Sequence, residues 1–253
     1  SENRGFTIDG ELGARWHLVG GAHQNKLSND VVFNPVGNYR LNSGEAGARY
    51  VTPAENSVTA VARTSRGEYQ DRTADPVSLL DTGFDQHEVE TRVIWHASAH
   101  SLFNGRLGYL ERKHDNFSQR DFSGTVGQLD YTWLPTTRTQ VLFSLIRDLA
   151  SYQEATNSYY VLDGFVISPT WQLSEKTTLR ARLDLNRRDF RGAVTSVSTM
   201  REDRNRVLLF GADWRASRDV LVTASVQRER RTSNLTGLDY SATVANLSAQ
   251  IAF

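Results

Sequence analysis

Apolar and polar residues alternate along most of this chain, most clearly over its last eleven residues. Side chains two residues apart share a face of a β-strand, so such a segment forms a strand with one apolar side and one polar side. Residues 178–186 read T-L-R-A-R-L-D-L-N, with charges on the polar side. The apolar face of the final strand would carry Thr243, Ala245, Leu247, Ala249, Ile251 and Phe253. This pattern indicates strands that separate an apolar medium from water.

An aromatic residue stands just before each of five short turns, and four of these five residues are Trp. Tryptophans filling a soluble core would not all precede tight turns, whereas Trp and Tyr favour the headgroup level of a membrane. We therefore expect an outward aromatic girdle near the short turns of a membrane barrel. The predicted girdle is Tyr50, Trp95, Trp133, Trp171 and Trp214.

Short turns alternate with longer polar connections near 23–40, 66–86, 113–121, 148–159, 189–203 and 231–238. Short periplasmic turns and long extracellular loops are typical of bacterial outer-membrane barrels. The sequence predicts an all-β, transmembrane, antiparallel up-and-down β-barrel of about twelve strands. It would form a single domain over residues 1–253, with both chain ends on the short-turn side. The predicted strands are 6–20, 41–52, 57–66, 87–99, 103–112, 122–134, 138–147, 160–172, 178–188, 206–215, 219–230 and 239–253.

Composition agrees with this prediction and excludes several classes of protein. No run approaches the roughly 20 apolar residues that a membrane helix needs. The 29 basic and 29 acidic residues balance, which removes a general electrostatic reason to expect a nucleic-acid partner. The absence of Cys excludes disulfides and thiolate zinc sites. A soluble β-sandwich or barrel is the alternative, and the expected location is the bacterial outer membrane.

A closed barrel requires the last strand to have a pairing partner on each side. In hydrocarbon every backbone N–H and C=O needs a partner, so strands can cross a membrane only as a closed barrel. The strand ending at Phe253, the expected assembly signal, should pair with the 219–230 strand on one side. On its other side it should pair with the first strand, near residues 6–18.

If the apolar face contacts lipid, the charged residues of the other face line the interior. These side chains could simply pair across strands and fill the lumen. They could instead form a narrow path whose forked arginine donors hold sugar hydroxyls or anionic groups. The candidate lumen and substrate-path residues are Arg49, Arg92, Arg112, Asp130, Arg180, Arg182, Asp184, Arg188, Asp213 and Glu229.

A second group of arginines lies at the long-loop ends of three consecutive strands. A solvated rim paired with its own acids is one interpretation. Contact with lipopolysaccharide phosphates or an anionic glycan is the other. The group comprises Arg187, Arg188, Arg191, Arg201, Arg204, Arg206, Arg228, Arg230 and Arg231.

Signals for catalysis are weak. None of the six His stands in H-E-x-x-H or another metal spacing, and the carboxylates show no spacing that singles out a glycosidase pair. A catalytic Ser–His pair whose members are distant in the sequence and adjacent in the fold remains an alternative. We expect no enzyme, no catalytic residue, no metal and no cofactor.

Several stretches of residues 105–253 resemble one family of outer-membrane barrels. They are G-Y-L-E-R-K-H from Gly108, R-D-F-S-G from Arg120, W-L-P-T-T-R-T from Trp133, S-P-T-W-Q-L-S-E-K-T-T-L from Ser168, R-R-D-F-R-G from Arg187 and E-R-R-T-S-N from Glu229. These stretches resemble the EpsL-like, exosortase-associated proteins encoded with exopolysaccharide genes. The order of the six stretches along the chain is more specific than any one of them.

This resemblance implies a channel, or a channel component, for exopolysaccharide export. A general or oligosaccharide-uptake porin, or a plugged anchor barrel that displays its loops to a partner, are the alternatives. Expected partners are outer-membrane lipid and lipopolysaccharide, with a secreted polysaccharide and periplasmic export components, and no nucleic acid.

Overall fold

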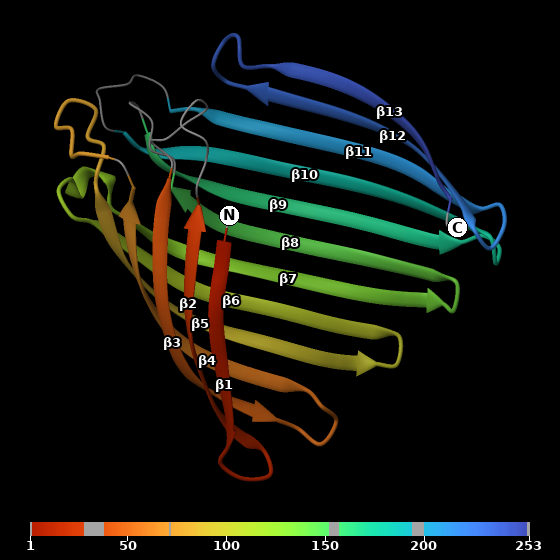
Figure 1. Cartoon of the computed structure of the whole chain (residues 1–253), viewed down its shortest axis with the longest axis horizontal. Helices are drawn as coiled ribbons and strands as arrows, with labels where there is room; N and C mark the ends of the chain where they lie inside the picture. Colours follow the sequence, from red (N-terminus) through yellow and green to blue (C-terminus); the bar gives the residue numbers. More distant parts are fainter. Residues whose placement is uncertain (1, 28–37, 71, 152–156, 194–199, 252–253) are drawn as a thin grey trace.

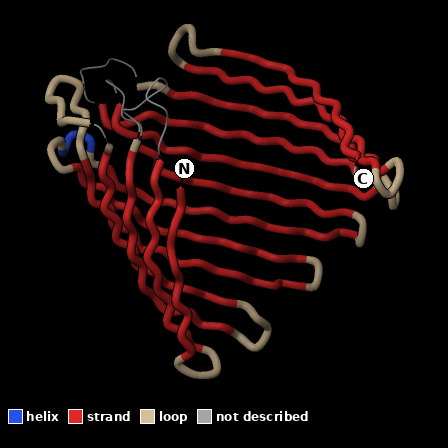
Figure 2. Tube along the Cα trace, in the orientation of Figure 1, coloured by secondary structure: helices blue, strands red, loops and turns tan. Residues whose placement is uncertain are grey.

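The computed structural model describes residues 2–27, 38–70, 72–151, 157–193 and 200–251. Over these residues the chain is almost entirely β-strand, with one 3-10 turn at Ser118–Arg120 (Figure 2). The first seven strands are β1 (Glu2–Glu11), β2 (Trp16–Leu27), β3 (Tyr39–Val51), β4 (Ser57–Tyr69), β5 (Gly83–Ser98), β6 (Ser101–His114) and β7 (Phe122–Thr136). The others are β8 (Thr139–Ser151), β9 (Asn157–Gln172), β10 (Thr177–Ala193), β11 (Glu202–Arg215), β12 (Val220–Ser233) and β13 (Tyr240–Ile251).

These strands form one curved sheet in which each strand pairs with its neighbours in sequence (Figure 1). Every pairing is antiparallel, from β1 with β2 to β12 with β13. Short turns lie at one end of the strands and the longer connections at the other. The predicted all-β, up-and-down fold class is confirmed, and the structure has thirteen strands where about twelve were expected.

The extra strand comes from the predicted first strand, which is wrong as a single element. Residues 6–20 belong to two strands, and Leu12 donates its backbone N–H to the Trp16 carbonyl at 2.8 Å to close the turn between them. Gly13 in this turn has a φ of +152°, which a residue without a Cβ adopts readily. The alternation continues through the turn, so it carried no sign of the break. β2 then runs on to Leu27, well into the predicted first loop.

The split also changes where the sheet begins. β1 starts at the long-loop end, because Glu2 pairs with Lys26, and ends at the short-turn end. The prediction that both chain ends lie on the short-turn side is therefore wrong. Since all neighbours are antiparallel and thirteen is odd, β1 and β13 run in the same direction.

The predicted pairing between the last and first strands is also wrong for the described residues. β13 pairs only with β12, and β1 pairs only with β2, so the sheet has two edges that lie apart (Figure 1). Antiparallel strands can be joined in sequence by short turns, but a β1–β13 seam would have to be parallel. Phe253 lies outside the described residues.

Apolar packing is concentrated at the long-loop end, inside the curve of the sheet. The pairing of β7 with β8 extends from their short turn to Gly127 and Arg147, and it does not continue from there toward the long-loop end. Leu149 and Val161 instead pack with three apolar side chains of β6 and β7. The buried cluster is Leu110, Phe122, Val126, Leu149 and Val161.

Candidate functional site on the inner face

The sheet separates its side chains into an inner and an outer set. On β4, Thr59, Val61 and Ser65 are buried, whereas Val58, next to Thr59, is 47% exposed. The cross-strand register carries this division around the sheet, since paired residues share a face. It places all ten candidate lumen residues on the inner face.

A compact group of charges occupies the inner face of β3–β6. Arg63 donates to Glu45 at 2.7 Å and to Glu88 at 3.1 Å. It also reaches Glu90 at 3.2 Å. Glu88 and Glu90 are each only 5% exposed. Burying carboxylates is costly unless each is paired, so the surrounding arginines hold this part of the wall together.

Two further arginines complete this group. Arg92 donates to Glu90 at 2.6 Å and to Glu45 at 3.1 Å. Arg106 lies 3.7 Å from Glu90. We call these six residues the inner ionic cluster: Glu45, Arg63, Glu88, Glu90, Arg92 and Arg106. With three charges of each sign the cluster is neutral, which favours a structural role.

A polar hollow of about 340 Å³ opens beside the inner ionic cluster. Arg49, Arg92 and Arg106 lie on one side of it and Asp130 on the other. Asp130 accepts hydrogen bonds from Gln128 at 2.8 Å and Ser144 at 2.5 Å. Arg49 pairs with Asp9. The hollow offers donors and one carboxylate to a hydroxyl-rich solute.

The inner face of β10–β12 has the same residue types in a more open setting. Arg180 donates to Asp213 at 2.9 Å, and Asp213 also accepts from Thr223 at 2.8 Å. Arg182 donates to Asp184 at 3.1 Å. The side chains of Arg180 and Arg182 are 43% and 48% exposed. We call this row of water-accessible ion pairs the inner ladder.

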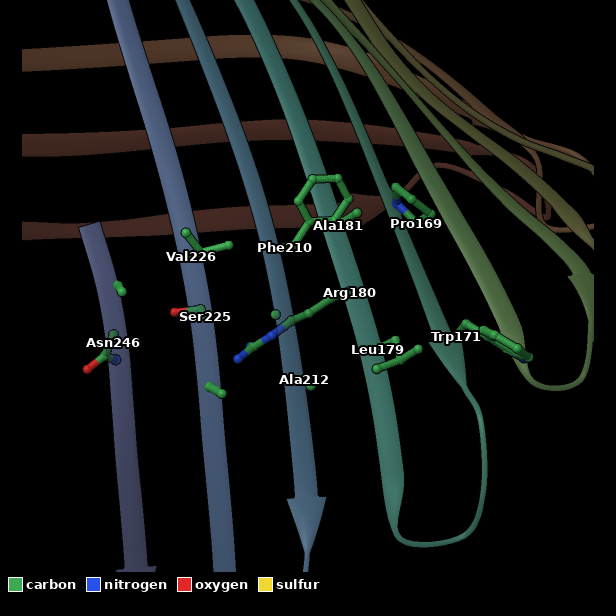
Figure 3. A pocket seen from close by; sticks show the side chains of 13 residues that line it. Pro169, Trp171, Leu179, Arg180, Ala181, Phe210, Ala212, Ser225, Val226 and Asn246 are labelled. Carbon is green, nitrogen blue, oxygen red and sulfur yellow. The ribbon is translucent and has the colours of Figure 1, made fainter. Parts of the chain in front are cut away.

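Glycine makes room for one member of the inner ladder. Arg180 extends from β10 across β11 at Gly211 (Figure 3). A Cβ at position 211 would lie 3.0 Å from the Arg180 Nε. The close approach of backbone and guanidinium allows Arg180 to reach Asp213 on the neighbouring strand.

Arginines stacked on aromatic rings follow the long-loop end of the inner face. Arg112 lies 3.9 Å from the Phe84 ring centre and 5.1 Å from that of Phe122. Arg188 lies 5.6 Å from Tyr160. The other stacked pairs are Arg72 with Tyr69, Arg201 with Phe190 and Arg231 with Tyr240, whose hydroxyl also contacts Glu229. Stacking fixes the plane of a guanidinium and so orients its donors. Most of these pairs could not be predicted from the sequence, because their members are far apart along the chain; Arg72 and Tyr69 are the exception, three residues apart.

The two loops above β4–β7 are joined by buried polar groups. Asp81 is fully buried and accepts hydrogen bonds from the backbone N–H groups of Asn116 and Phe117, at 2.8 and 2.9 Å. Burial would raise the pKa of Asp81, but hydrogen bonds from Asn116, Phe117 and Gly83 outweigh it and hold the pKa below its ordinary value. Arg120, also fully buried, donates to the carbonyls of Leu79 and Asn157 at 2.6 and 3.0 Å.

The structure places the five predicted girdle aromatics on the outer face, near the short turns. The four Trp are 42–53% exposed. Trp16, which was not in the predicted set, lies 5.1 Å from Tyr50. Further rings extend the row across β5–β8, where Phe103 stacks on Tyr131 at 4.4 Å.

The rim arginines divide between the two faces. Arg188, Arg201 and Arg231 are on the inner face, in the stacked pairs above. Six others are on the outer face: Arg187, Arg191, Arg204, Arg206, Arg228 and Arg230. Arg187 pairs with Asp189 and Glu202, at 2.7 and 2.9 Å. The prediction grouped the nine by proximity along the chain, although strand alternation already puts neighbours such as Arg187 and Arg188 on opposite faces.

Within the described ranges, no group of three or more His, Asp or Glu side chains is placed to hold a metal ion. Those same ranges contain no helix long and apolar enough to cross a membrane.

Solved structures share this fold at low sequence identity. The FrpB iron transporter from Neisseria meningitidis (F3-3 variant) aligns with a TM-score of 0.58 and 11% identity, over 91% of this chain and 44% of its own. The copper transporter OprC aligns with a TM-score of 0.58 and 10% identity, over 98% of this chain and 49% of its own. The ferric yersiniabactin uptake receptor FyuA from Yersinia pestis aligns with a TM-score of 0.53 and 11% identity, over 94% of this chain and 43% of its own. These likenesses show the fold of outer-membrane barrels, and the chain spans less than half the length of each.

A family model decides the family. No curated protein matches the chain in sequence. The model described as "Putative beta-barrel porin 2" matches residues 101–253, which is more than half of the chain and runs from β6 to beyond β13. This family and the barrel fold support a channel role and favour a non-enzymatic one. The chain is a protein of the bacterial outer membrane and belongs to the beta-barrel porin 2 family.

Proposed function

We propose that this chain lines an outer-membrane channel through which a secreted polysaccharide leaves the cell. The observation that carries the proposal is the inner ladder, whose arginines are about half exposed to water. A wall that was only structural filling would bury these charges against one another, as the inner ionic cluster does. Forked, oriented guanidinium donors suit hydroxyl-rich and anionic sugars.

The stacked arginines at the long-loop end support the same cargo. Their rings hold the guanidinium planes in place, so little side-chain entropy is lost when a donor binds a sugar oxygen. The likeness to the EpsL-like proteins, carried by the motifs of residues 105–253, is the reason to favour a secreted polymer over an imported solute.

A plugged anchor barrel is the second candidate, and one observation favours it. The buried apolar cluster of β6–β9, together with the Asp81 and Arg120 contacts, fills part of the long-loop end. A lumen that is dry throughout would conduct no ions.

Conductance in planar bilayers tests the proposal. We expect single-channel steps from the purified protein, and we expect fragments of the secreted polysaccharide, but not an unrelated neutral oligosaccharide, to block them. Deletion of the gene should abolish the secreted polymer while leaving its synthesis intact. Conductance with no block and unchanged secretion would indicate a general porin. No conductance would indicate the anchor.

A further inference from the structure

Three arginines on the outer face have no acidic partner among the residues that the structure describes. Arg206, Arg228 and Arg230 are exposed, and no hydrogen bond or ion pair joins them to any acid in the described ranges. The other outer arginines nearby differ, since Arg187 and Arg204 both contact Glu202. The unpaired three therefore form a local excess of positive charge.

Their arrangement makes the excess unfavourable for the isolated chain. Arg206 on β11 lies directly opposite Arg230 on β12, and Arg228 lies opposite Leu208. Side chains directly opposite one another have Cβ atoms only about 5 Å apart, and like charges in such a pair destabilise the sheet. An anion bound from outside the chain would remove this repulsion.

An apolar groove begins on the short-turn side of these arginines, at the next outward-facing residue pair after Leu208 and Arg228. Leu208 and Arg228 are followed, toward the short turns, by Phe210 and Val226. Phe210 and Val226 line a groove of about 680 Å³ whose far wall is Trp171 and Leu179 (Figure 3). Alanines of β10–β13 form its floor: Ala181, Ala212, Ala224 and Ala245. Small side chains between large ones leave a depression that fits an acyl chain.

The position along the membrane normal fits the same ligand. Trp214 marks the short-turn side of the outer face, and Arg206 lies eight residues further along the strand. Eight residues span about 26 Å of strand, or about 20 Å along the normal at a tilt of about 40°. The apolar band of a barrel is about 25 Å tall. Arg206 and Arg230 thus stand about 5 Å inside the far edge of the band, and Arg228 about 5 Å deeper. Their long side chains extend from there toward the headgroup phosphates.

We propose that Arg206, Arg228 and Arg230, with the groove below them, form a binding site for a phosphorylated lipid of the outer leaflet. The guanidinium groups bind its phosphate, and the groove over β10–β13 holds one of its acyl chains. In an outer membrane the corresponding lipid is lipopolysaccharide. The site is independent of the channel proposal, because it lies on the opposite face of the sheet.

Lipid binding by native mass spectrometry of the delipidated protein tests this site. The probes are diphosphorylated lipid A and the same lipid without its phosphates. We expect the phosphorylated form to bind about tenfold more tightly, and the triple change Arg206→Gln, Arg228→Gln and Arg230→Gln to remove that preference. The matched control is Arg147→Gln, Arg187→Gln and Arg204→Gln, which removes three paired arginines from the same face and should keep the preference.

Further variants separate the two halves of the site. Ala224→Phe fills the groove and should weaken both lipids alike, whereas replacing the three arginines by Lys should retain the preference. A heat-dependent shift in gel migration verifies that each variant is folded. Equal binding of the two lipids, or a triple Gln variant that keeps the preference, overturns the proposal. Displacement of the lipid by millimolar inorganic phosphate would also overturn it, by identifying a site for a free anion.

Discussion

The inner faces of β3–β6 and β10–β12 carry the same residue types and differ in their surroundings. In the inner ionic cluster, one arginine bridges several carboxylates, and Glu88 and Glu90 are 5% exposed. In the inner ladder, each ion pair stands separately and Arg182 is 48% exposed. A buried charge that loses its partner is costly, whereas an exposed pair contributes little. Alternation with apolar residues therefore places these charges on the inner face, and the local packing decides whether they are enclosed by one another or open to water.

The largest effect should follow removal of Arg63. Arg63→Ala leaves Glu45, Glu88 and Glu90 without their shared partner, so we expect the free energy of unfolding to fall by about 3–5 kcal/mol. Urea unfolding in detergent, followed by Trp fluorescence, measures this change. The control is Arg66→Ala on the same strand, whose side chain is 41% exposed and pairs with Asp115. Equal losses in the two variants would contradict the distinction between enclosed and exposed ion pairs.

The loops above β4–β7 should respond to acid. Since the pKa of Asp81 is lowered in the folded protein, its stabilising contribution is complete above its ordinary pKa, near 4. It is lost as the pH falls from there through the lower, folded-state pKa. We expect proteolysis at residues 72–82 to accelerate below about pH 4, assayed with an acid-stable protease.

Asp81→Asn should show the same fast cleavage already at pH 7, because it replaces a charged acceptor of backbone N–H groups at a cost of about 2 kcal/mol. Asp85→Asn is the control, since Asp85 is exposed and lies just outside this contact network. Cleavage in the wild type that does not depend on pH would remove Asp81 from this role.

The fold was predictable because alternation and turn spacing are local properties of the sequence. Eleven of the predicted strands correspond to β3–β13, with ends that differ by a few residues. The turn at Gly13 was missed because both sides of it continue the same alternation. The closure error has a different origin, since closure was expected from the need of backbone groups in hydrocarbon for partners and not from a pattern in the sequence. The predicted register could assign Arg63 and Arg182 to one face. It could not show that one is enclosed by three carboxylates and the other is open to water, since that depends on the curvature of the whole sheet.

A smaller effect should follow a change within the inner ladder. Asp213 joins β10 and β12 by accepting from Arg180 and Thr223, and its side chain is 25% exposed. Asp213→Ala should lower the free energy of unfolding by about 1 kcal/mol, because the hydrogen bonds are lost but water replaces them. The same urea assay applies, with the exposed turn residue Asp219→Ala as control. A loss comparable to that of Arg63→Ala would mean that the inner ladder is as dry as the inner ionic cluster.

The smallest effect on stability, and the most informative one for function, is expected at Arg182. Its side chain is half exposed and its partner Asp184 remains hydrated without it, so Arg182→Ala should change the free energy of unfolding by less than about 0.5 kcal/mol. A fixed cation in a narrow channel with low-dielectric walls biases which ions enter, so its removal should shift the reversal potential toward cation selectivity. Bilayer recordings in a salt gradient measure that shift. Arg187→Ala, on the outer face of the same strand, should leave the reversal potential unchanged. A large loss of stability in Arg182→Ala, with no conductance in the parent protein, would reject the channel and favour the plugged anchor.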